Sequence, residues 1–322
     1  MHIKILFSKI ALLIILLCTI SCNNKGILKS PNFILILSDD QGWNATSFEM
    51  ISGADYSKSD YYETPNIENL AKSGMVFSRA YSPAPTCSPT RYAIQFGQTP
   101  ARLKHIRVSM NVDHIDHKGM TTIPRALKRI DSNYVAGHFG KFGMYSEPIN
   151  FGYDFSDGMT GNIDGNIDGT VQTKWLPQHD EDPKQIFGIT KRSLSFMEEQ
   201  VKQDNPFFLQ VSHYAVHSDL VSRKEIYEKY KEKNRGRYHE NSSIAAMTED
   251  MDLSVGKILE KVKELGIEDN TYVIYMSDNG AVEQILGSKK TNKENRGYNY
   301  PCLLYTSPSP RDQRGSRMPS CA

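Results

Sequence analysis

Pro31-Asn32-Phe33-Ile34-Leu35-Ile36-Leu37-Ser38-Asp39-Asp40 is the stretch that decides the fold. Its apolar run is continuous and is bounded by a proline on one side and by two aspartates on the other. Such a run is typical of a strand that is buried on both faces, as in the centre of a parallel sheet. We therefore expect a central strand that ends at the aspartate pair.

Further apolar runs alternate with stretches of helical period. Strands are expected at 75–77, 134–139, 206–212 and 271–276, the last of them buried, and helices at 67–73, 90–96, 123–130, 190–202 and 243–265. This alternation predicts an α/β sandwich with a largely parallel central sheet flanked by helices. Residues 145–185 are loop-rich. The repeat GNIDGNIDG at 161–169 lacks the acidic closing position of a calcium-binding EF-hand loop, so we interpret it as a solvated turn.

Polar side chains follow directly on four of the expected strands. They are Asp39-Asp40, Lys141, the pair His213 and His217, and Asp278-Asn279. In a parallel sheet, functional groups collect beyond the carboxyl ends of the strands, so the topology alone gathers these sets into one crevice. Carboxylate and amide oxygens suit calcium or magnesium better than zinc. The alternative for an Asp-Asp pair is a helix cap or a solvated turn.

Cys87 is the only cysteine between residues 23 and 301. A lone cysteine in a domain that looks exported has no disulfide partner there, so its thiol is either buried and inert or chemically used. It stands in the segment Pro85-Thr86-Cys87-Ser88-Pro89-Thr90-Arg91, where proline two residues after the cysteine suits the first turn of a helix. That helix would direct its free backbone amides at an anion.

The two ends differ from the rest of the chain. Lys4 and Lys9 precede an apolar run from Ile10 to Ile20 and then Ser21-Cys22, which predicts a signal peptide over 1–22 of the lipoprotein type and a tether over 23–30. The alternative is an ordinary signal peptide in which Cys22 is incidental. We expect an exported protein, periplasmic or anchored by its N-terminal lipid in a bacterial outer membrane. Residues 302–322 have no helical or strand period and are interpreted as an artefactual, adaptor-like tail, the alternative being a natural disordered tail.

Five motifs together resemble type I, formylglycine-dependent sulfatases of the alkaline phosphatase superfamily. They are Ile36–Trp43, Thr64–Ile67, Cys87–Arg91, Gly137–Lys141 and Ser277–Gly280. The resemblance runs from about Asn32 to Pro301 and implies an alkaline-phosphatase-like sandwich over 31–301. Relatives continue through a glycine-rich segment with a second active-site lysine into a C-terminal subdomain. We expect this chain to be truncated before both, and therefore to be insoluble or inactive as it stands.

The resemblance also implies a mechanism. Cys87 would be oxidised to formylglycine by a maturation enzyme, and a hydroxyl of the hydrated aldehyde would attack sulfur. Calcium would be held by Asp39, Asp40, residue 87, Asp278 and Asn279. The catalytic residues would be Cys87, Arg91, Lys141 and His217, with Lys141 on the sulfate and His217 on the leaving oxygen. His213 and His138 are expected to be structural. Many sulfatases have a histidine where this chain has Gly143.

The sequence therefore predicts a sulfuric ester hydrolase that acts on sulfated small molecules or carbohydrates. The alternatives are a phosphate or phosphonate monoester hydrolase of the same superfamily and a catalytically dead protein that binds sulfated glycans. The net charge of the whole chain is +1, so nothing in its charge balance indicates a nucleic-acid partner.

Overall fold

The computed structural model describes residues 29–162, 181–217, 220–282 and 298–299. Met1–Ser30 forms a unit separate from Pro31–Ala322, and the second unit contains all the elements that follow. The predicted signal peptide, most of the 161–169 repeat and the predicted tail lie outside the described residues. None of the described helices combines the length and the apolar character that crossing a membrane requires.

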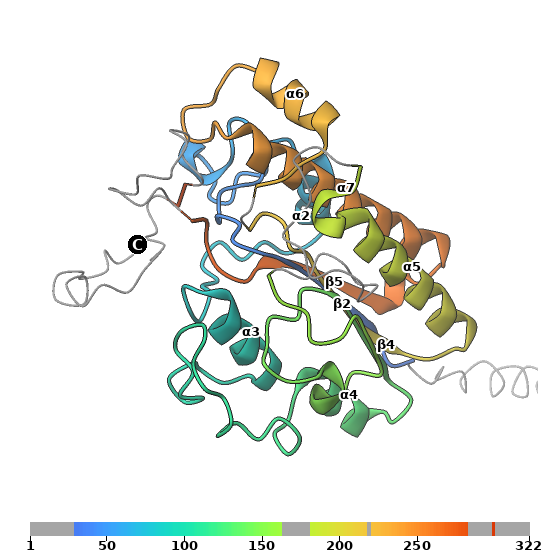
Figure 1. The fold of residues 1–322 in the computed structure, drawn as a ribbon. Helices are drawn as coiled ribbons and strands as arrows, with labels where there is room; N and C mark the ends of the chain where they lie inside the picture. Colours follow the sequence, from blue (N-terminus) through green and yellow to red (C-terminus); the bar gives the residue numbers. More distant parts are fainter. Residues whose placement is uncertain (1–28, 163–180, 218–219, 283–297, 300–322) are drawn as a thin grey trace, which may run out of the picture. The chain divides into compact units, whose positions relative to one another are not determined.

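A parallel sheet forms the centre of the domain (Figure 1). Its described strands are β1 (Asn32–Ser38), β2 (Val135–Gly140), β3 (Phe155–Ser156), β4 (Phe207–Ser212) and β5 (Thr271–Ser277). They are ordered β3-β2-β4-β1-β5, and every pairing is parallel. The central position of β1, between β4 and β5, confirms the interpretation of the PNFILILSDD stretch.

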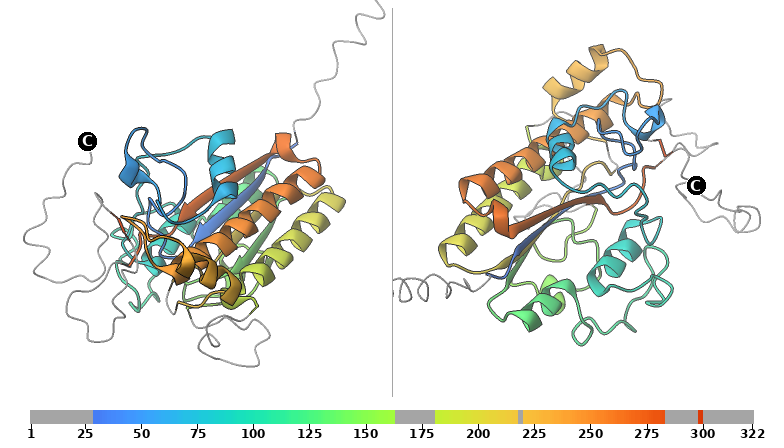
Figure 2. Two further views of the ribbon diagram at one scale, coloured as in Figure 1. Left: turned by 90° about the horizontal axis from the view of Figure 1, so that it is seen from above. Right: turned by 180° about the vertical axis from the view of Figure 1, so that it is seen from behind.

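Helices cover both faces of the sheet (Figures 1 and 2). The longer ones are α2 (Pro65–Ser73), α3 (Cys87–Phe96), α4 (Ile123–Ile130), α5 (Ile186–Lys202), α6 (Lys224–Glu232) and α7 (Ser242–Glu264). Helices α5 and α7 pack on one face, whereas α3 and α4 lie on the other. Successive side chains of β1 point to opposite faces of the sheet. Ile34 and Ile36 lie in the core under α5 and α7, and Leu35 lies in the core beside α3.

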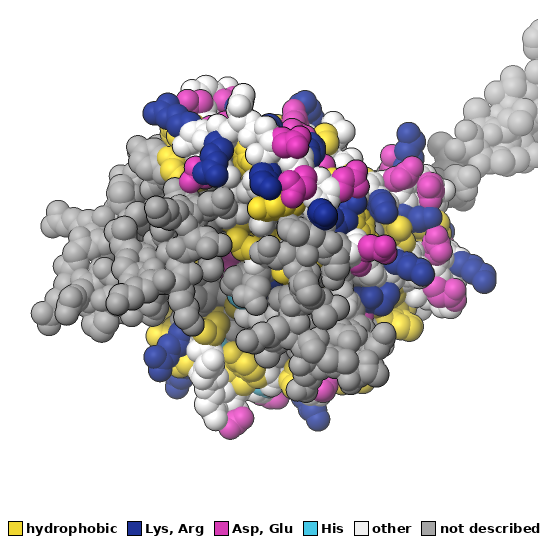
Figure 3. Space-filling model, turned by 45° about the horizontal axis from the view of Figure 1, so that its top comes forward, with side chains coloured by type: hydrophobic (Ala, Val, Ile, Leu, Met, Phe, Trp, Pro, Cys, Tyr) yellow, Lys and Arg dark blue, Asp and Glu magenta, His cyan; other side chains and the backbone are white. Residues whose placement is uncertain are grey.

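Short helical turns occupy several connections. They are 3-10 turns at η1 (Asp55–Ser57), η2 (Pro148–Phe151), η3 (Pro183–Gln185) and η4 (Glu268–Asn270). On the face shown in Figure 3, basic and acidic side chains are interspersed. Lys229 of α6, for example, contacts both Glu63 and Glu249, at 2.6 and 2.7 Å. This mixed surface agrees with the small net charge of the chain.

The predicted strand at Met75–Phe77 is wrong. This segment lies in a loop, and the side chains of Met75 and Phe77 are 78% and 67% exposed. An extended apolar segment becomes a strand only when another strand pairs with it, and none of the described strands does so here. Helix α6 was not predicted. Its sequence KEIYEKYKE is short and mostly charged, and its buried residues are only Ile226 and Tyr230, which lie one helical turn apart.

The expectation that β5 is a buried strand is also wrong for the described residues. Tyr272 is 61% exposed and Ile274 is 47% exposed, because β5 pairs with β1 alone and forms an edge of the described sheet. The predicted bounds of the other helices and strands agree with the structure to within four residues.

Candidate active site

The carboxyl ends of β1, β2, β4 and β5 deliver the predicted polar residues to one end of the sheet. Ligand atoms of Asp39, Cys87 and Asp278 all lie within 4.8 Å of one another. Asp39 follows β1, Asp278 follows β5, and Cys87 is the first residue of α3. Segments nearly 240 residues apart along the chain therefore meet as the parallel topology predicts.

Hydrogen bonds across the ends of β1 and β5 fix the two acidic pairs. The Asp278 amide donates to the Ser38 carbonyl at 3.1 Å, and the Asp40 amide donates to Asp278 Oδ1 at 3.2 Å. The Asn279 side-chain amide donates to Asp40 Oδ1 at 2.6 Å. The four residues thus form one cross-linked set of oxygen atoms rather than two independent turns.

Helix α3 begins at Cys87, three residues earlier than the predicted start. Its N-cap residue, Thr86, provides no side-chain cap, so the first backbone amides of the helix are not used by a capping side chain. The loop before the helix is tied to the end of β5, because Ser82 Oγ donates to the Asp278 carbonyl at 2.6 Å. Residue 87 is therefore held beside the acidic pairs at a helix end that favours anions.

Arg91 lies one helical turn beyond Cys87 and is 1% exposed. Its Nε and Nη2 atoms contact Asp278 Oδ2 at 3.0 and 2.9 Å, and its Nη1 atom donates to the Lys141 carbonyl. Arg91 Nη2 lies 3.6 Å from Asp39 Oδ1. The guanidinium group thus links the ends of β1, β2 and β5.

Lys141 follows β2, is 1% exposed, and forms an ion pair with Asp39 Oδ2. Burial lowers the pKa of Lys141, but Asp39, Cys87 and Asp278 together more than offset this, so the pKa lies above its ordinary value and the ammonium group keeps its charge. Burial raises the pKa of Asp278, and the nearby Asp39 raises it further, while Arg91 and Lys141 oppose this. Burial likewise raises the pKa of the Cys87 thiol.

The three histidines named from the sequence occupy different environments. The His217 side chain is 21% exposed and its Nε2 atom lies 3.6 Å from Asp40 Oδ2, at the outer side of the cluster. His213 is fully buried with Nε2 3.1 Å from Ser254 Oγ, and His138 is fully buried with Nε2 3.1 Å from Ser212 Oγ. Burial lowers the pKa of His213 to about 4 and that of His138 to about 3, so both are neutral packed residues.

The oxygen atoms of the acidic pairs fit a hard divalent cation. Asp39 Oδ1 and Asn279 Oδ1 are buried and accept no hydrogen bond from the described residues. Buried polar atoms without a partner are uncommon, and two oxygens of this kind beside Asp40 and Asp278 match the ligands that calcium and magnesium take. No imidazole nitrogen belongs to the cluster of closest ligand atoms within the described residues, which disfavours zinc.

Two residues that the sequence did not indicate hold the turn that carries Lys141. Thr160 bonds to the backbone at Gly140, Phe142 and Gly143, and Asp157 accepts from the Gly140 amide. Neither lies in a motif or at the end of a predicted strand, so no sequence signal could have found them. Gly143 has φ +67°, and a Cβ there would lie 2.8 Å from Arg91 Cδ, so a larger residue at this position would displace Arg91.

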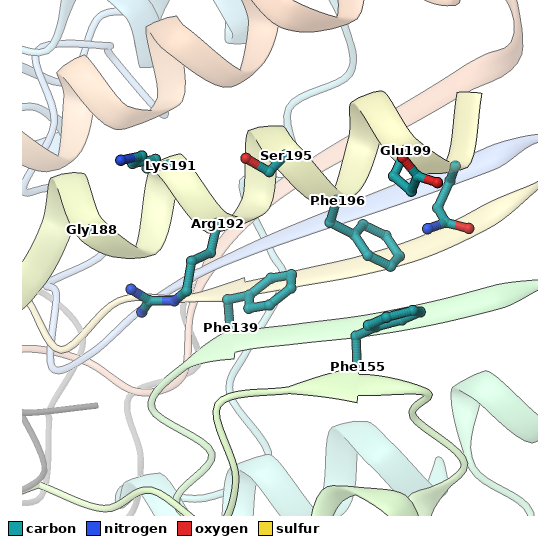
Figure 4. A pocket seen from close by; sticks show the side chains of 9 residues that line it. Phe139, Phe155, Gly188, Lys191, Arg192, Ser195, Phe196 and Glu199 are labelled. Carbon is teal, nitrogen blue, oxygen red and sulfur yellow. The ribbon is translucent and has the colours of Figure 1, made fainter. Parts of the chain in front are cut away.

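An apolar groove lies between α5 and the strands β2 and β3 (Figure 4). Three phenylalanines line it, namely Phe139, Phe155 and Phe196, together with charged residues that include Arg192 and Glu199. It shares no residue with the cluster around Cys87, so it is not part of this site.

Comparison with known proteins gives one consistent result. The model of the family described as Sulfatase matches residues 31–319. N-acetylgalactosamine-6-sulfatase of Mus musculus is 27% identical over 304 residues, which cover 84% of this chain and 54% of that protein. A protein of Formosa agariphila named Sulfatase is 26% identical over 351 residues, which cover 85% of this chain and 62% of that protein. The chain thus spans little more than half the length of these relatives.

Solved structures share the fold. Ps i-CgsB, which has also been solved in complex with k-i-k-neocarrahexaose, has a TM-score of 0.62 and 24% identity, over 85% of this chain and 61% of that chain. A phosphonate monoester hydrolase of Agrobacterium radiobacter has a TM-score of 0.56 and 16% identity, over 82% of this chain and 66% of that chain. At these identities the similarity concerns the fold, which both proteins have in common with this chain.

Proposed function

The chain belongs to the sulfatase family, and on this premise we propose that it hydrolyses sulfate esters at the cluster around residue 87. The observation that carries the proposal is the meeting of Cys87 with Asp39 and Asp278 within 4.8 Å, with two buried cationic side chains beside them. A nucleophile position, a set of hard oxygen ligands and fixed positive charges are what transfer of a sulfuryl group requires.

The charge balance of the cluster supports a metal ion. Asp39, Asp40 and Asp278 bring three carboxylates, whereas Arg91 and Lys141 bring two positive charges. With all five ionised, the protein side chains leave one negative charge in excess, which would repel an anionic ester. One divalent cation reverses that sign, so anion binding follows once the ion is present.

We assign calcium to this position, held by Asp39, Asp40, Asp278, Asn279 and residue 87. When bound, it would supply positive charge that polarises the ester and the group at residue 87. Arg91 then serves to orient Asp278 through its two contacts and to neutralise charge at the centre. Lys141, buried beside Asp39, is positioned to bind a sulfate oxygen.

Residue 87 is proposed to act as formylglycine. The conversion replaces the thiol of Cys87 by an aldehyde oxygen; it is an oxidation, so it needs an external oxidant and a maturation enzyme as a partner. The hydrated aldehyde supplies one hydroxyl for attack on sulfur and a second whose deprotonation allows sulfate to be released. The N-terminus of α3 favours negative charge at this point.

His217 is proposed as the proton donor to the leaving alcohol. It is the most exposed of the three histidines near the strand ends, so its ring can reach a substrate that His213 and His138 cannot. The alcohol leaves from the solvent side of the cluster, which is where His217 lies.

Sulfated carbohydrates are the proposed substrates. Relatives named for N-acetylgalactosamine-6-sulfate and a similar fold solved with k-i-k-neocarrahexaose support this class. We further propose that the protein is exported and is held at a bacterial membrane through lipid on Cys22, because of the apolar run that precedes Ser21-Cys22.

A phosphate or phosphonate ester hydrolase is the second candidate, because a phosphonate monoester hydrolase shares the fold. Turnover of matched aryl sulfate and aryl phosphate esters by the complete protein tests the choice. We expect kcat/KM to favour the sulfate, and a preference for the phosphate would overturn the proposal. A protein that binds sulfated glycans but turns over neither ester would be the catalytically dead alternative.

A further inference from the structure

The turn from Gly140 to Gly143 places Lys141 in the site, and its backbone is unusual. Gly140 has φ +94° and Gly143 has φ +67°. A Cβ at Gly140 would lie 2.0 Å from the Ser212 carbonyl oxygen. Two glycines in this region of φ leave a chain that is free to adopt many conformations, so other residues must fix the turn.

Thr160 bonds to the turn on both sides of Lys141. Its hydroxyl donates to the Gly140 carbonyl at 2.6 Å and accepts from the Phe142 amide at 2.9 Å. Its backbone carbonyl accepts from the Gly143 amide at 2.8 Å. Thr160 is 8% exposed, so water does not readily replace these bonds.

Asp157 adds a second attachment on the same segment. Its Oδ2 atom accepts from the Gly140 amide at 2.7 Å, and both of its carboxylate oxygens bind Arg192, each at 2.9 Å. Arg192 extends from α5 toward the strands (Figure 4). The turn is therefore anchored through Asp157 to a helix of the core.

We infer that Thr160 is a positioning residue for the proposed reaction, whose hydroxyl holds the Gly140–Gly143 turn so that Lys141 meets the sulfate group. The inference rests on the proposed contact between Lys141 and sulfate. Errors of about 1 Å in the placement of a binding group can cost roughly a hundredfold in rate. The hydroxyl of one residue outside the cluster thus controls the position of a charge inside it.

The test compares Thr160→Val, which keeps the shape and removes the hydroxyl, with Thr160→Ser, which keeps the hydroxyl. In the complete protein, Thr160→Val should lower kcat/KM for an aryl sulfate by about tenfold or more, mainly through KM, because Lys141 binds ground state and transition state alike. Thr160→Ser should restore most of the loss. Thr160→Ala replaces the valine variant if the latter does not fold.

A second readout does not depend on turnover. Acetic anhydride modifies accessible lysines, and peptide mass spectrometry gives the rate at each position. The rate of acetylation of Lys141 should rise in Thr160→Val and not in Thr160→Ser. Lys184 is also 1% exposed and serves as the internal control, because its protection in the wild type and in both variants would show that the fold is intact.

The outcomes separate the two claims. Wild-type KM together with unchanged acetylation of Lys141 in Thr160→Val would overturn the inference. If the wild-type protein does not turn over sulfate esters, the proposed function fails, and the acetylation of Lys141 alone still decides whether Thr160 positions it.

Discussion

Arg91 and Asp278 are 187 residues apart in the sequence, yet Nε and Nη2 of Arg91 lie 3.0 and 2.9 Å from the same carboxylate oxygen, and both side chains are at most 1% exposed. A buried ion pair of this kind is costly to leave half-made, because the remaining charge has no water to stabilise it. The pair therefore holds the first turns of α3 against the end of β5. It also fixes the position of Asp278 within the site.

Replacing Arg91 by methionine should destabilise the protein by about 3–5 kcal/mol, since it leaves Asp278 buried without its partner. Urea unfolding measures the change. Lys229→Met is the matched control, because Lys229 is 41% exposed and its ion pairs lie at the surface, where a pair contributes less than about 1 kcal/mol. Equal losses in the two variants would contradict the importance given to the buried pair.

Much of this arrangement could be predicted from the sequence. The apolar runs that end at Asp39-Asp40 and at Asp278-Asn279 predict parallel strands, and parallel strands place their carboxyl ends at one edge. The Cys87–Arg91 motif could be assigned to a helix start. These features are local, so a short stretch of sequence contains the information that they need.

Other parts depend on contacts between distant segments. Thr160 and Asp157 hold the Lys141 turn, but neither residue type nor spacing marks them. Met75–Phe77 has the apolar character of a strand and lacks a described partner strand. The exposure of Tyr272 depends on which strands lie beside β5, which the composition of β5 does not reveal.

Calcium should raise the thermal midpoint of the complete protein. A ligand at a hundredfold excess over its Kd stabilises by about 2.7 kcal/mol, and a chelator should reverse the shift. Asp40→Asn should abolish most of the calcium-dependent rise in the thermal midpoint. Asp269→Asn, which changes an exposed carboxylate just before β5, should leave that rise unchanged. A shift of equal size in both variants would place calcium elsewhere.

Stability should fall as the pH drops from about 6.5 toward 4, in part because of His213. Its folded pKa of about 4 lies below the value of about 6.5 for an unfolded histidine, so the unfolded chain binds more protons in that window. The contribution of neutral His213 to the free energy of unfolding is fully present above pH 6.5. It is lost progressively as the pH falls to 4, and the total loss is about 3 kcal/mol.

The variant His213→Asn should flatten the dependence of the unfolding free energy on pH across this window. The control is Gln203→Asn, an exposed substitution that removes no titratable group and should leave the slope as in the wild type. An unchanged slope in His213→Asn would show that other groups cause the loss at low pH.

Replacing His217 by asparagine should lower kcat most for poor leaving groups. A proton donor matters little when the departing phenol is acidic and matters increasingly as its pKa rises, with losses of about a hundredfold or more. A series of aryl sulfates with graded phenol pKa measures this. A uniform loss across the series would indicate that His217 binds sulfate rather than protonating the leaving oxygen.

The central claim is that residue 87 works as an aldehyde and not as a thiol. Peptide mass spectrometry of the tryptic fragment Ala80–Arg91 from active protein, with a hydrazine to trap carbonyl groups, tests it most directly. We predict a hydrazone at position 87, and no turnover of aryl sulfate by Cys87→Ala. An active preparation in which that fragment carries an unmodified cysteine thiol would contradict the account.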